Sequence, residues 1–212
     1  MTRPALIFDF GNVVGFFDYS RMYDRFGRRL GVTGTDLEAS LARKGVASLG
    51  REFELGKISA EEFARRVSDL AGLDMGYEEF ESEWPDIFTL NEPVARLVEG
   101  LDRAGYTLLL GSNTNALHAR CFRSKFRETL DRFDHLVFSF ELGVMKPDPA
   151  FFAACVALAG VPAESCIFID DAAANVAGAI SAGLRGVTYR DPAGLVAQLA
   201  DLGVCAPAAS QA

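Results

Sequence analysis

Carboxylates stand at the ends of two apolar runs in this 212-residue sequence. Asp9 directly follows the apolar residues 5–8, and Asp170 and Asp171 end a second apolar run at 166–169. Such runs are typical of strands buried on both faces, and parallel sheets bind ligands at the carboxyl ends of their strands. Each acid is therefore a candidate nucleophile or metal ligand. The alternative for each is a helix N-cap, and neither stretch alone decides between the two.

A hydroxyl, an amide and an ammonium group follow two further predicted strands. Ser112 and Asn113 come shortly after the run at 106–110, and Lys146 follows the run at 136–140. Taken singly, Ser112 and Asn113 are typical turn residues, and Lys146 is typical of a solvated loop. If all four strands are parallel neighbours, however, these groups and the carboxylates converge at one edge of the sheet.

That set of groups suits phosphoryl transfer. Oxygen ligands such as carboxylates and backbone carbonyls are those that Mg²⁺ accepts in proteins. An ammonium and a hydroxyl offset the charge of phosphoryl oxygens in the transition state. A carboxylate such as Asp9 can act as a nucleophile and form an acyl phosphate. The residues thus favour chemistry on a phosphorylated substrate.

Helices alternate with short apolar strands from residue 91 onward, which predicts an α/β fold. Strand–helix–strand units with long crossovers give a doubly wound, parallel, Rossmann-like sheet with helices on both faces. Because residues 1–15 supply the first strand, we expect a core domain built from 1–15 and 91–205. The closing residues, 206–212, are mostly small, and we expect a disordered tail there.

Residues 16–90 differ from the rest of the chain. Charged and apolar residues alternate there at helical spacing, and no clear strand is present. The clearest helix begins at Ser59, where Ser59 and Glu62 form a capping box. We therefore expect a small all-helical cap domain, inserted after the first strand.

Charge and composition limit the partners. The formal net charge is -8 and the isoelectric point is near 4.8, whereas nucleic acids and anionic membranes favour basic faces. Charges interrupt every apolar run, so we expect neither a membrane span nor a signal peptide. Widely spaced cysteines are typical of reduced thiols. We expect a cytoplasmic protein, a monomer or weak homodimer, whose partner is a small phosphorylated molecule and neither nucleic acid nor membrane.

The same residues make the sequence resemble the haloacid dehalogenase (HAD) superfamily of hydrolases over nearly its whole length. The helical insertion lies where that superfamily carries its cap. Four motifs stand in the superfamily's order: Ile7-Phe8-Asp9-Phe10-Gly11-Asn12-Val13, Leu109-Leu110-Gly111-Ser112-Asn113-Thr114, Lys146-Pro147, and Ile169-Asp170-Asp171 with Asn175. Within the superfamily, the sequence is most similar to small sugar-phosphate phosphatases of the glucose-1-phosphate type, which share the Glu-x-Gly-x-Ile-Ser segment found at 54–59.

The resemblance implies which residues hold the metal. Asp9 would be the nucleophile and a Mg²⁺ ligand. Asp170 would be a second ligand, and the backbone carbonyl of Gly11 would be a third, a role that does not depend on a side chain. Asp171 and Asn175 would support this site.

The resemblance also implies how the substrate is held. Ser112 and Asn113 would bind the phosphoryl group, and Lys146 would balance the charge of nucleophile and phosphate. Phe17 and Asp18, near the cap junction, are the best candidates for contacts that set specificity.

Three other residues have weaker signals. Glu54, in the shared cap segment, is a candidate to face the site. His118 and His135 lack a partner pattern, so we interpret both as structural or surface residues.

These assignments imply a Mg²⁺-dependent hydrolase of phosphomonoesters, acting on a small phosphorylated metabolite such as a sugar phosphate through an aspartyl-phosphate on Asp9. Most phosphatases of the superfamily carry a second aspartate two residues later, and such a general acid is worth about 10²–10⁴-fold in rate. Here that position is Gly11. Two alternatives therefore stay open: a 2-haloacid dehalogenase-type hydrolase, and a catalytically weak phosphate-binding member of the fold.

Overall fold

Five parallel strands in the order β5-β4-β1-β6-β7 form the centre of the protein, for which a computed structural model describes residues 3–205. The strands are β1 (Ala5–Phe8), β4 (Leu108–Ser112), β5 (His135–Phe138), β6 (Cys166–Asp170) and β7 (Arg185–Thr188). Every residue of β1, β4 and β6 is buried, as expected for central strands covered on both faces. The α/β class and the parallel sheet predicted from the sequence are confirmed.

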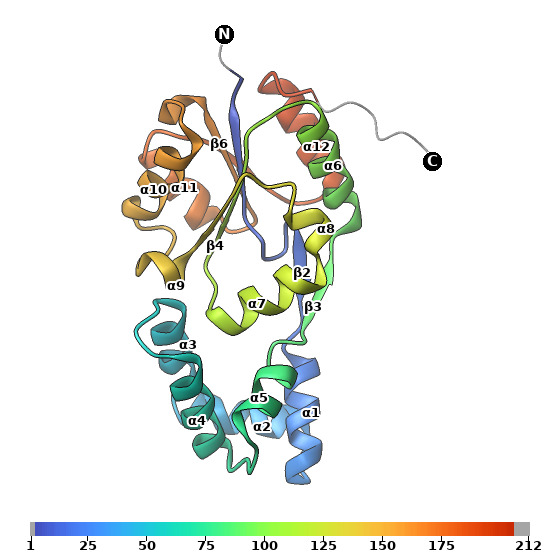
Figure 1. Ribbon diagram of the computed structural model, residues 1–212, viewed down its shortest axis with the longest axis vertical. Helices are drawn as coiled ribbons and strands as arrows, with labels where there is room; N and C mark the ends of the chain where they lie inside the picture. Colours follow the sequence, from blue (N-terminus) through green and yellow to red (C-terminus); the bar gives the residue numbers. More distant parts are fainter. Residues whose placement is uncertain (1–2, 206–212) are drawn as a thin grey trace.

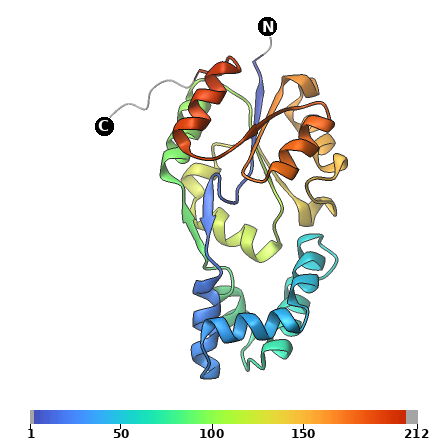
Figure 2. The same cartoon turned by 180° about the vertical axis from the view of Figure 1, so that it is seen from behind.

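Helices cover both faces of this sheet (Figures 1 and 2). One face carries α10 (Pro149–Ala159) and α11 (Ala173–Ser181), and the other carries α6 (Glu92–Arg103) and α12 (Pro192–Asp201). Successive side chains of a strand point to opposite faces. Accordingly, Leu6 and Phe8 belong to the apolar core on the α6 side, whereas Ile7 belongs to the core beneath α10.

The strand register brings the predicted site residues to one edge. Phe8, the last residue of β1, pairs with Leu110 in β4 and with Ile169 in β6. The next residues along the three strands therefore emerge together: Asp9 from β1, the glycine and serine at 111–112 from β4, and Asp170 from β6.

Five helices form a cap that lies below the sheet in Figure 1. They are α1 (Ser20–Leu30), α2 (Gly34–Arg43), α3 (Val46–Glu54), α4 (Ala60–Ala71) and α5 (Tyr77–Glu83). Stacked aromatic rings fill its interior, with Phe53 against Phe63 at 4.4 Å and Phe80 against Trp84 at 5.2 Å between ring centroids. The predicted cap of α4 is present, because the Ser59 hydroxyl accepts the N–H of Glu62.

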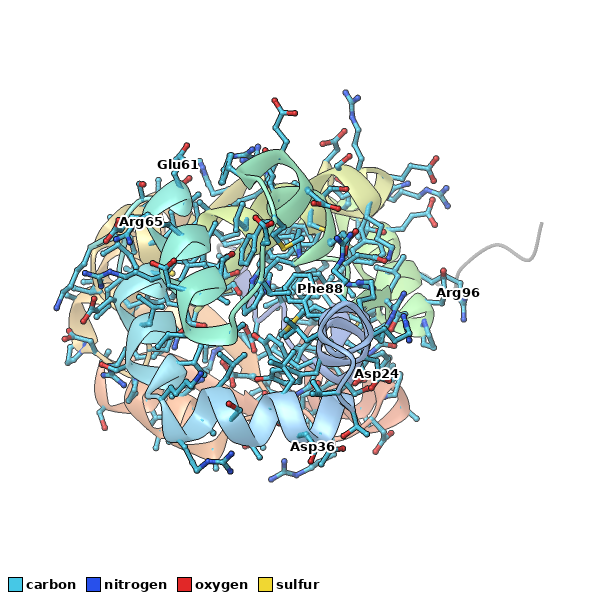
Figure 3. The ribbon with its side chains drawn as sticks, turned by 90° about the horizontal axis from the view of Figure 1, so that it is seen from below. Asp24, Asp36, Glu61, Arg65, Phe88 and Arg96 are labelled. Carbon is cyan, nitrogen blue, oxygen red and sulfur yellow. The ribbon has the colours of Figure 1, made fainter. Side chains whose placement is uncertain are left out.

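Two short antiparallel strands, β2 (Gly15–Phe17) and β3 (Phe88–Leu90), join the cap to the sheet. The sequence predicts no strand between residues 16 and 90, and these two strands show that this prediction is wrong. Each strand has three residues, which are too few to show a periodicity in the sequence. In Figure 3, which views the molecule from the cap end, Phe88 of β3 lies near the centre while Glu61 and Arg65 lie at the rim. The predicted domain boundaries, 15/16 and 90/91, fall at this two-stranded ribbon and stay a proposal.

The helical segment after Ser112 is broken in two. It divides at Phe126 into α7 (Ala116–Lys125) and α8 (Arg127–Leu130), because the Phe126 backbone leaves helical geometry, with φ -118° and ψ 34°. Two further short helical segments, α9 (Ser139–Leu142) and the 3₁₀ turn η1 (Ala163–Ser165), follow β5 and precede β6.

Across residues 3–205, no helix has both the length and the apolar character needed to cross a membrane. The tail predicted at residues 206–212 lies outside the described residues.

Asn91 stands at the N-cap position of α6 but does not cap that helix. Its side chain makes no cap hydrogen bond. Instead the buried amide nitrogen donates to the carbonyl oxygen of Val13 and to the hydroxyl oxygen of Tyr189, each at 2.8 Å. Val13 lies just before β2 and Tyr189 directly follows β7, and a buried acceptor without a donor is costly. Asn91 therefore ties the end of β3 to the loop after β1.

We expect Asn91→Ala to lower the free energy of unfolding by about 1–3 kcal/mol, because it leaves the buried Val13 carbonyl without its donor. Urea denaturation followed by circular dichroism measures this change. Gln198→Ala is a matched control, since Gln198 is a partly exposed amide on α12 and its loss should cost less than about 0.5 kcal/mol. Equal losses in the two variants would contradict the assigned role.

Candidate active site

Asp9 leaves β1 as a nearly buried carboxylate, with 8% of its surface exposed. Its Oδ1 accepts from the Lys146 ammonium at 2.7 Å and from the N–H of Phe10 at 2.7 Å. Burial raises the pKa of Asp9 to about 6; Lys146 works against this rise and Asp170 adds to it. At neutral pH the carboxylate is therefore ionised, which is the form that a nucleophile needs.

Lys146 holds the centre of the site. Its ammonium is buried and donates to Asp9 at 2.7 Å, to Asp170 at 2.8 Å and to the carbonyl of Gly111 at 2.9 Å. An ammonium has three N–H donors, so all of them are used. Burial alone would lower the pKa of Lys146, but the two carboxylates outweigh it and the pKa is raised. Lys146 is thus a fixed positive charge, in keeping with its predicted charge-balancing role.

Asn113 positions Lys146 through both ends of its amide. Its Oδ1 accepts the N–H of Lys146 at 2.8 Å, and its Nδ2 donates to the Lys146 carbonyl at 3.0 Å. The sequence predicts Asn113 as a substrate contact. Asn113 lines the cavity, and its side chain ties the loop after β4 to the loop that carries the lysine.

Asp170 is fully buried, and four hydrogen bonds occupy its oxygens. Oδ1 accepts from the N–H of Ala172 and from Asn175, and Oδ2 accepts from Lys146 and again from Asn175, at 2.8–3.1 Å. The bond to Ala172 is not a helix cap, because α11 has Ala172 as its N-cap residue and no side-chain cap bond. The bond to Lys146 makes Asp170 part of the charged cluster as well.

Asp171 is partly exposed, and its carboxylate accepts fewer hydrogen bonds than that of Asp170. Its Oδ2 accepts from the side chain of Asn12 at 2.9 Å, and its Oδ1 has no hydrogen bond to any residue in 3–205. Oxygens of Asp9, Asp170 and Asp171 lie within 4.8 Å of one another. This all-oxygen donor set fits a hard divalent cation such as Mg²⁺.

A cavity of about 220 Å³ opens above these groups. Core and cap both line it, and the predicted residues among its walls are Asp9, Gly11, Ser112, Asn113, Lys146, Asp171 and Asn175 from the core, with Phe17 and Glu54 from the ribbon and cap. Asp170 lies beneath the floor. Asp18, predicted to contact substrate, does not line the cavity; its carboxylate accepts from the N–H and hydroxyl of Ser20 and so begins α1.

Gly11 lies against an aromatic ring. A Cβ atom built on Gly11 would lie 3.1 Å from Cε1 of Phe17, tighter than an ordinary contact. The ring of Phe17 is 41% exposed, so a shift of a few tenths of an ångström would admit a side chain at position 11. As it stands, position 11 supplies no side chain to the cavity, and the Phe17 ring lies next to it.

His118 lines the cavity, whereas the sequence predicts only a structural or surface role for it. It is 4% exposed and lies among the rings of Tyr19, Trp84 and Phe88. Asn115 accepts the His118 N–H through Oδ1, which leaves its Nδ2 to donate to Nδ1 of the imidazole at 3.0 Å. This amide orientation assigns the neutral tautomer with hydrogen on Nε2. The spacing Asn115-x-x-His118 is the signal that could have revealed this arrangement.

Comparison with known proteins agrees with this geometry. Residues 5–183 match the haloacid dehalogenase-like hydrolase family. The chain is 31% identical over 179 residues to D-ribitol-5-phosphate phosphatase of Bacteroides thetaiotaomicron, an alignment that covers 81% of this chain and 84% of that protein.

Solved structures show the same fold. A HAD family enzyme from Bacteroides thetaiotaomicron has a TM-score of 0.78 and 23% identity, over 90% of this chain and 95% of that one. A HAD family enzyme structure from the same organism, in complex with magnesium and inorganic phosphate, has a TM-score of 0.74 and 24% identity, over 89% and 95%. Similarity at this level of identity establishes the architecture alone.

The buried imidazole of His118 should make folding sensitive to acid. Burial lowers its pKa to about 3, against an ordinary value of 6.5. Below pH 6.5 the unfolded chain binds a proton at this imidazole and the folded chain does not. The free energy of unfolding therefore decreases as the pH is lowered. Between pH 6.5 and pH 5 we expect this residue to cost about 1.5 kcal/mol of folding free energy.

His118→Gln removes the titrating group, so the variant should lose that much less stability over the same interval. Urea denaturation of both proteins at the two pH values measures the difference. Parallel losses in wild type and variant would contradict a buried neutral imidazole.

Proposed function

Because the chain belongs to the haloacid dehalogenase-like hydrolase family, we propose that it hydrolyses phosphomonoesters of small metabolites, with Asp9 as nucleophile and Mg²⁺ as cofactor. The observation that carries the proposal is the cluster at the cavity floor, where one buried ammonium joins the carboxylates of Asp9 and Asp170 at 2.7 and 2.8 Å. A fixed cation beside an ionised, nearly buried carboxylate stabilises the charge that develops on a phosphoryl group.

Sugar and sugar-alcohol phosphates are the proposed substrates. The relative that is 31% identical acts on a five-carbon sugar-alcohol phosphate, as its name states. The cavity volume of about 220 Å³ suits a phosphoryl group with a small leaving group. Its lining supplies hydroxyl, amide and carboxylate groups that can bond sugar hydroxyls.

The carboxylates and a backbone carbonyl supply the metal site in this proposal. Asp9, Asp171 and the carbonyl of Gly11 would hold Mg²⁺, which when bound neutralises phosphoryl charge and orients the phosphate toward the nucleophile. The four hydrogen bonds on Asp170 favour a different role for it from the ligand role that the sequence predicts. Asp170 then anchors Lys146, and Asn175 anchors Asp170.

The reaction proceeds through this chain's own groups. The Asp9 carboxylate attacks phosphorus, the bond to the leaving oxygen breaks, and an aspartyl-phosphate forms. The buried hydroxyl of Ser112, at the end of β4, donates to a phosphoryl oxygen, and Lys146 holds Asp9 in place. Water then cleaves the aspartyl-phosphate and releases inorganic phosphate.

We expect Asp9→Asn to abolish hydrolysis of 4-nitrophenyl phosphate, because an amide is not a nucleophile at phosphorus. Chelation by EDTA should have the same effect, and added Mg²⁺ should reverse it. Release of nitrophenolate measured at neutral pH tests both. Activity that survives either treatment contradicts the proposal, and halide release from a 2-haloacid without Mg²⁺ would support the dehalogenase alternative instead.

Substitution of Asp170 and of Asp171 should have different effects on Mg²⁺ binding and on stability. Asp171→Asn should weaken Mg²⁺ binding more than about 10-fold by calorimetry, with little change in stability. Asp170→Asn should lower the free energy of unfolding by about 3 kcal/mol, because a new amide donor would face the buried donors of Lys146 and Asn175. The reverse order of effects would restore Asp170 as the direct ligand.

A further inference from the structure

The proposed phosphatase lacks an evident proton donor. An alkoxide leaving group must be protonated as its bond to phosphorus breaks, and position 11 offers no side chain. The Phe17 ring lies beside this position. If the proposed function holds, the proton comes from another group that lines the same cavity or from water.

Two core groups that line the cavity already have other partners. All three N–H donors of Lys146 are bonded to protein oxygens. Asp171 accepts from Asn12 and belongs to the proposed metal site. Neither has a proton to give to a leaving oxygen.

The two ring side chains are poor acids. His118 is a neutral imidazole whose pKa burial lowers to about 3, so it carries no excess proton at neutral pH. Burial, together with the nearby carboxylate of Glu54, raises the pKa of the Tyr19 phenol well above its ordinary value. An acid is most effective when its pKa lies near the operating pH.

Glu54 is the remaining carboxyl group of the cavity wall. It is the last residue of α3 and lines both the 220 Å³ cavity over Asp9 and a second cavity of about 630 Å³, which cap residues and Met145 of the core surround. Tyr19 is the other residue that borders both. Glu54 therefore stands between the phosphoryl site and the space beyond it, which is where a leaving group must lie.

The backbone of Glu54 is fixed to the core. Its carbonyl accepts from the buried hydroxyl of Ser139 at 2.7 Å, and the same hydroxyl oxygen accepts the N–H of Thr114 at 3.0 Å. Thr114 follows Ser112 and Asn113 in the loop that lines the phosphoryl site. One hydroxyl thus holds the cap carboxyl and the core loop together.

The packing two residues later reinforces this attachment. Gly56 has a φ of +66°, and a Cβ atom there would collide with the carbonyl of Phe140. Only glycine allows the cap loop to lie this close to the segment after β5. The position of Glu54 above the core is therefore determined by direct contacts.

Burial raises the pKa of the Glu54 carboxyl, and Arg51 on the same helix offsets part of this rise. The net shift is upward, so the carboxyl keeps a proton at a higher pH than a free glutamate does. Such tuning is what a general acid near neutral pH requires.

We propose that Glu54 is the general acid and base of this phosphatase, replacing the carboxyl group that position 11 lacks. As Asp9 attacks phosphorus, the bond to the leaving oxygen breaks and the Glu54 proton passes to that oxygen, which releases a neutral alcohol and leaves a carboxylate. The carboxylate then takes a proton from the water that attacks the aspartyl-phosphate. The Asp9–phosphate bond breaks, inorganic phosphate leaves, and both side chains return to their starting states.

Glu54→Gln tests this role against leaving-group basicity. We expect kcat/KM for alkyl phosphates such as ribitol 5-phosphate, glycerol 3-phosphate and glucose 6-phosphate to fall about 100- to 10,000-fold. Phosphorylation of the enzyme by 4-nitrophenyl phosphate should fall less than about 10-fold, because nitrophenolate leaves without a proton. Stopped-flow mixing should then show a burst of nitrophenolate, since the second step has lost its base.

Glu52→Gln is the matched control. Glu52 lies on the same helix and pairs with Arg66 on the cap surface, outside the catalytic cavity. Its kinetics should equal those of wild type. For a second measurement, formate added to Glu54→Ala should restore alkyl phosphate turnover by supplying a small carboxylic acid to the vacated space.

The remaining outcomes contradict either the role of Glu54 or the proposed function. Equal losses for alkyl and aryl substrates, unchanged kinetics, or no rescue by formate would exclude Glu54 as the acid. A wild type that cleaves aryl but not alkyl phosphates would exclude it too. If wild type hydrolyses no phosphate of the panel with Mg²⁺ present, the proposed function itself fails.

Discussion

The buried ammonium of Lys146 is the interaction on which the rest of the site depends. It lies between a carboxylate of β1 and a carboxylate of β6, and it also bonds the Gly111 carbonyl of β4. Removing one partner from a buried charge pair costs about 3–5 kcal/mol. The three central strands therefore cannot slip relative to one another without separating these charges. The register of the sheet and the position of the nucleophile, Asp9, are maintained by the same contacts.

The convergence of the charged residues could be predicted from the sequence because it follows from local patterns and one topological rule. Apolar runs mark the strands, and polar residues at their carboxyl ends must meet if the strands are parallel neighbours. Asp9, Ser112, Lys146 and Asp170 all follow this logic. The helical cap could be predicted as well, because the apolar spacing at 60–71 is that of an amphipathic helix.

The rest could not be predicted, because it depends on contacts between segments distant in the sequence. The amide of Asn113 bonds the backbone of Lys146, and that of Asn91 bonds the carbonyl of Val13; no local pattern reveals either pair. The position of Asp18 near the cap predicts a substrate contact, yet its carboxylate begins a helix. Burial of His118 depends on rings from the cap and ribbon closing over it. Location in the cytoplasm and the oligomeric state stay predictions.

The hydroxyl of Ser139 joins the cap to the core with two acceptors within its reach. A hydroxyl carries one hydrogen, yet two carbonyl oxygens lie within reach of this one, that of Glu54 at 2.7 Å and that of Thr114 at 3.0 Å. The hydrogen can turn from the first carbonyl to the second, so the hydroxyl has an acceptor in either orientation and no donor is stranded in the interior. The junction between cap and core is thus joined by a group that can exchange one partner for another.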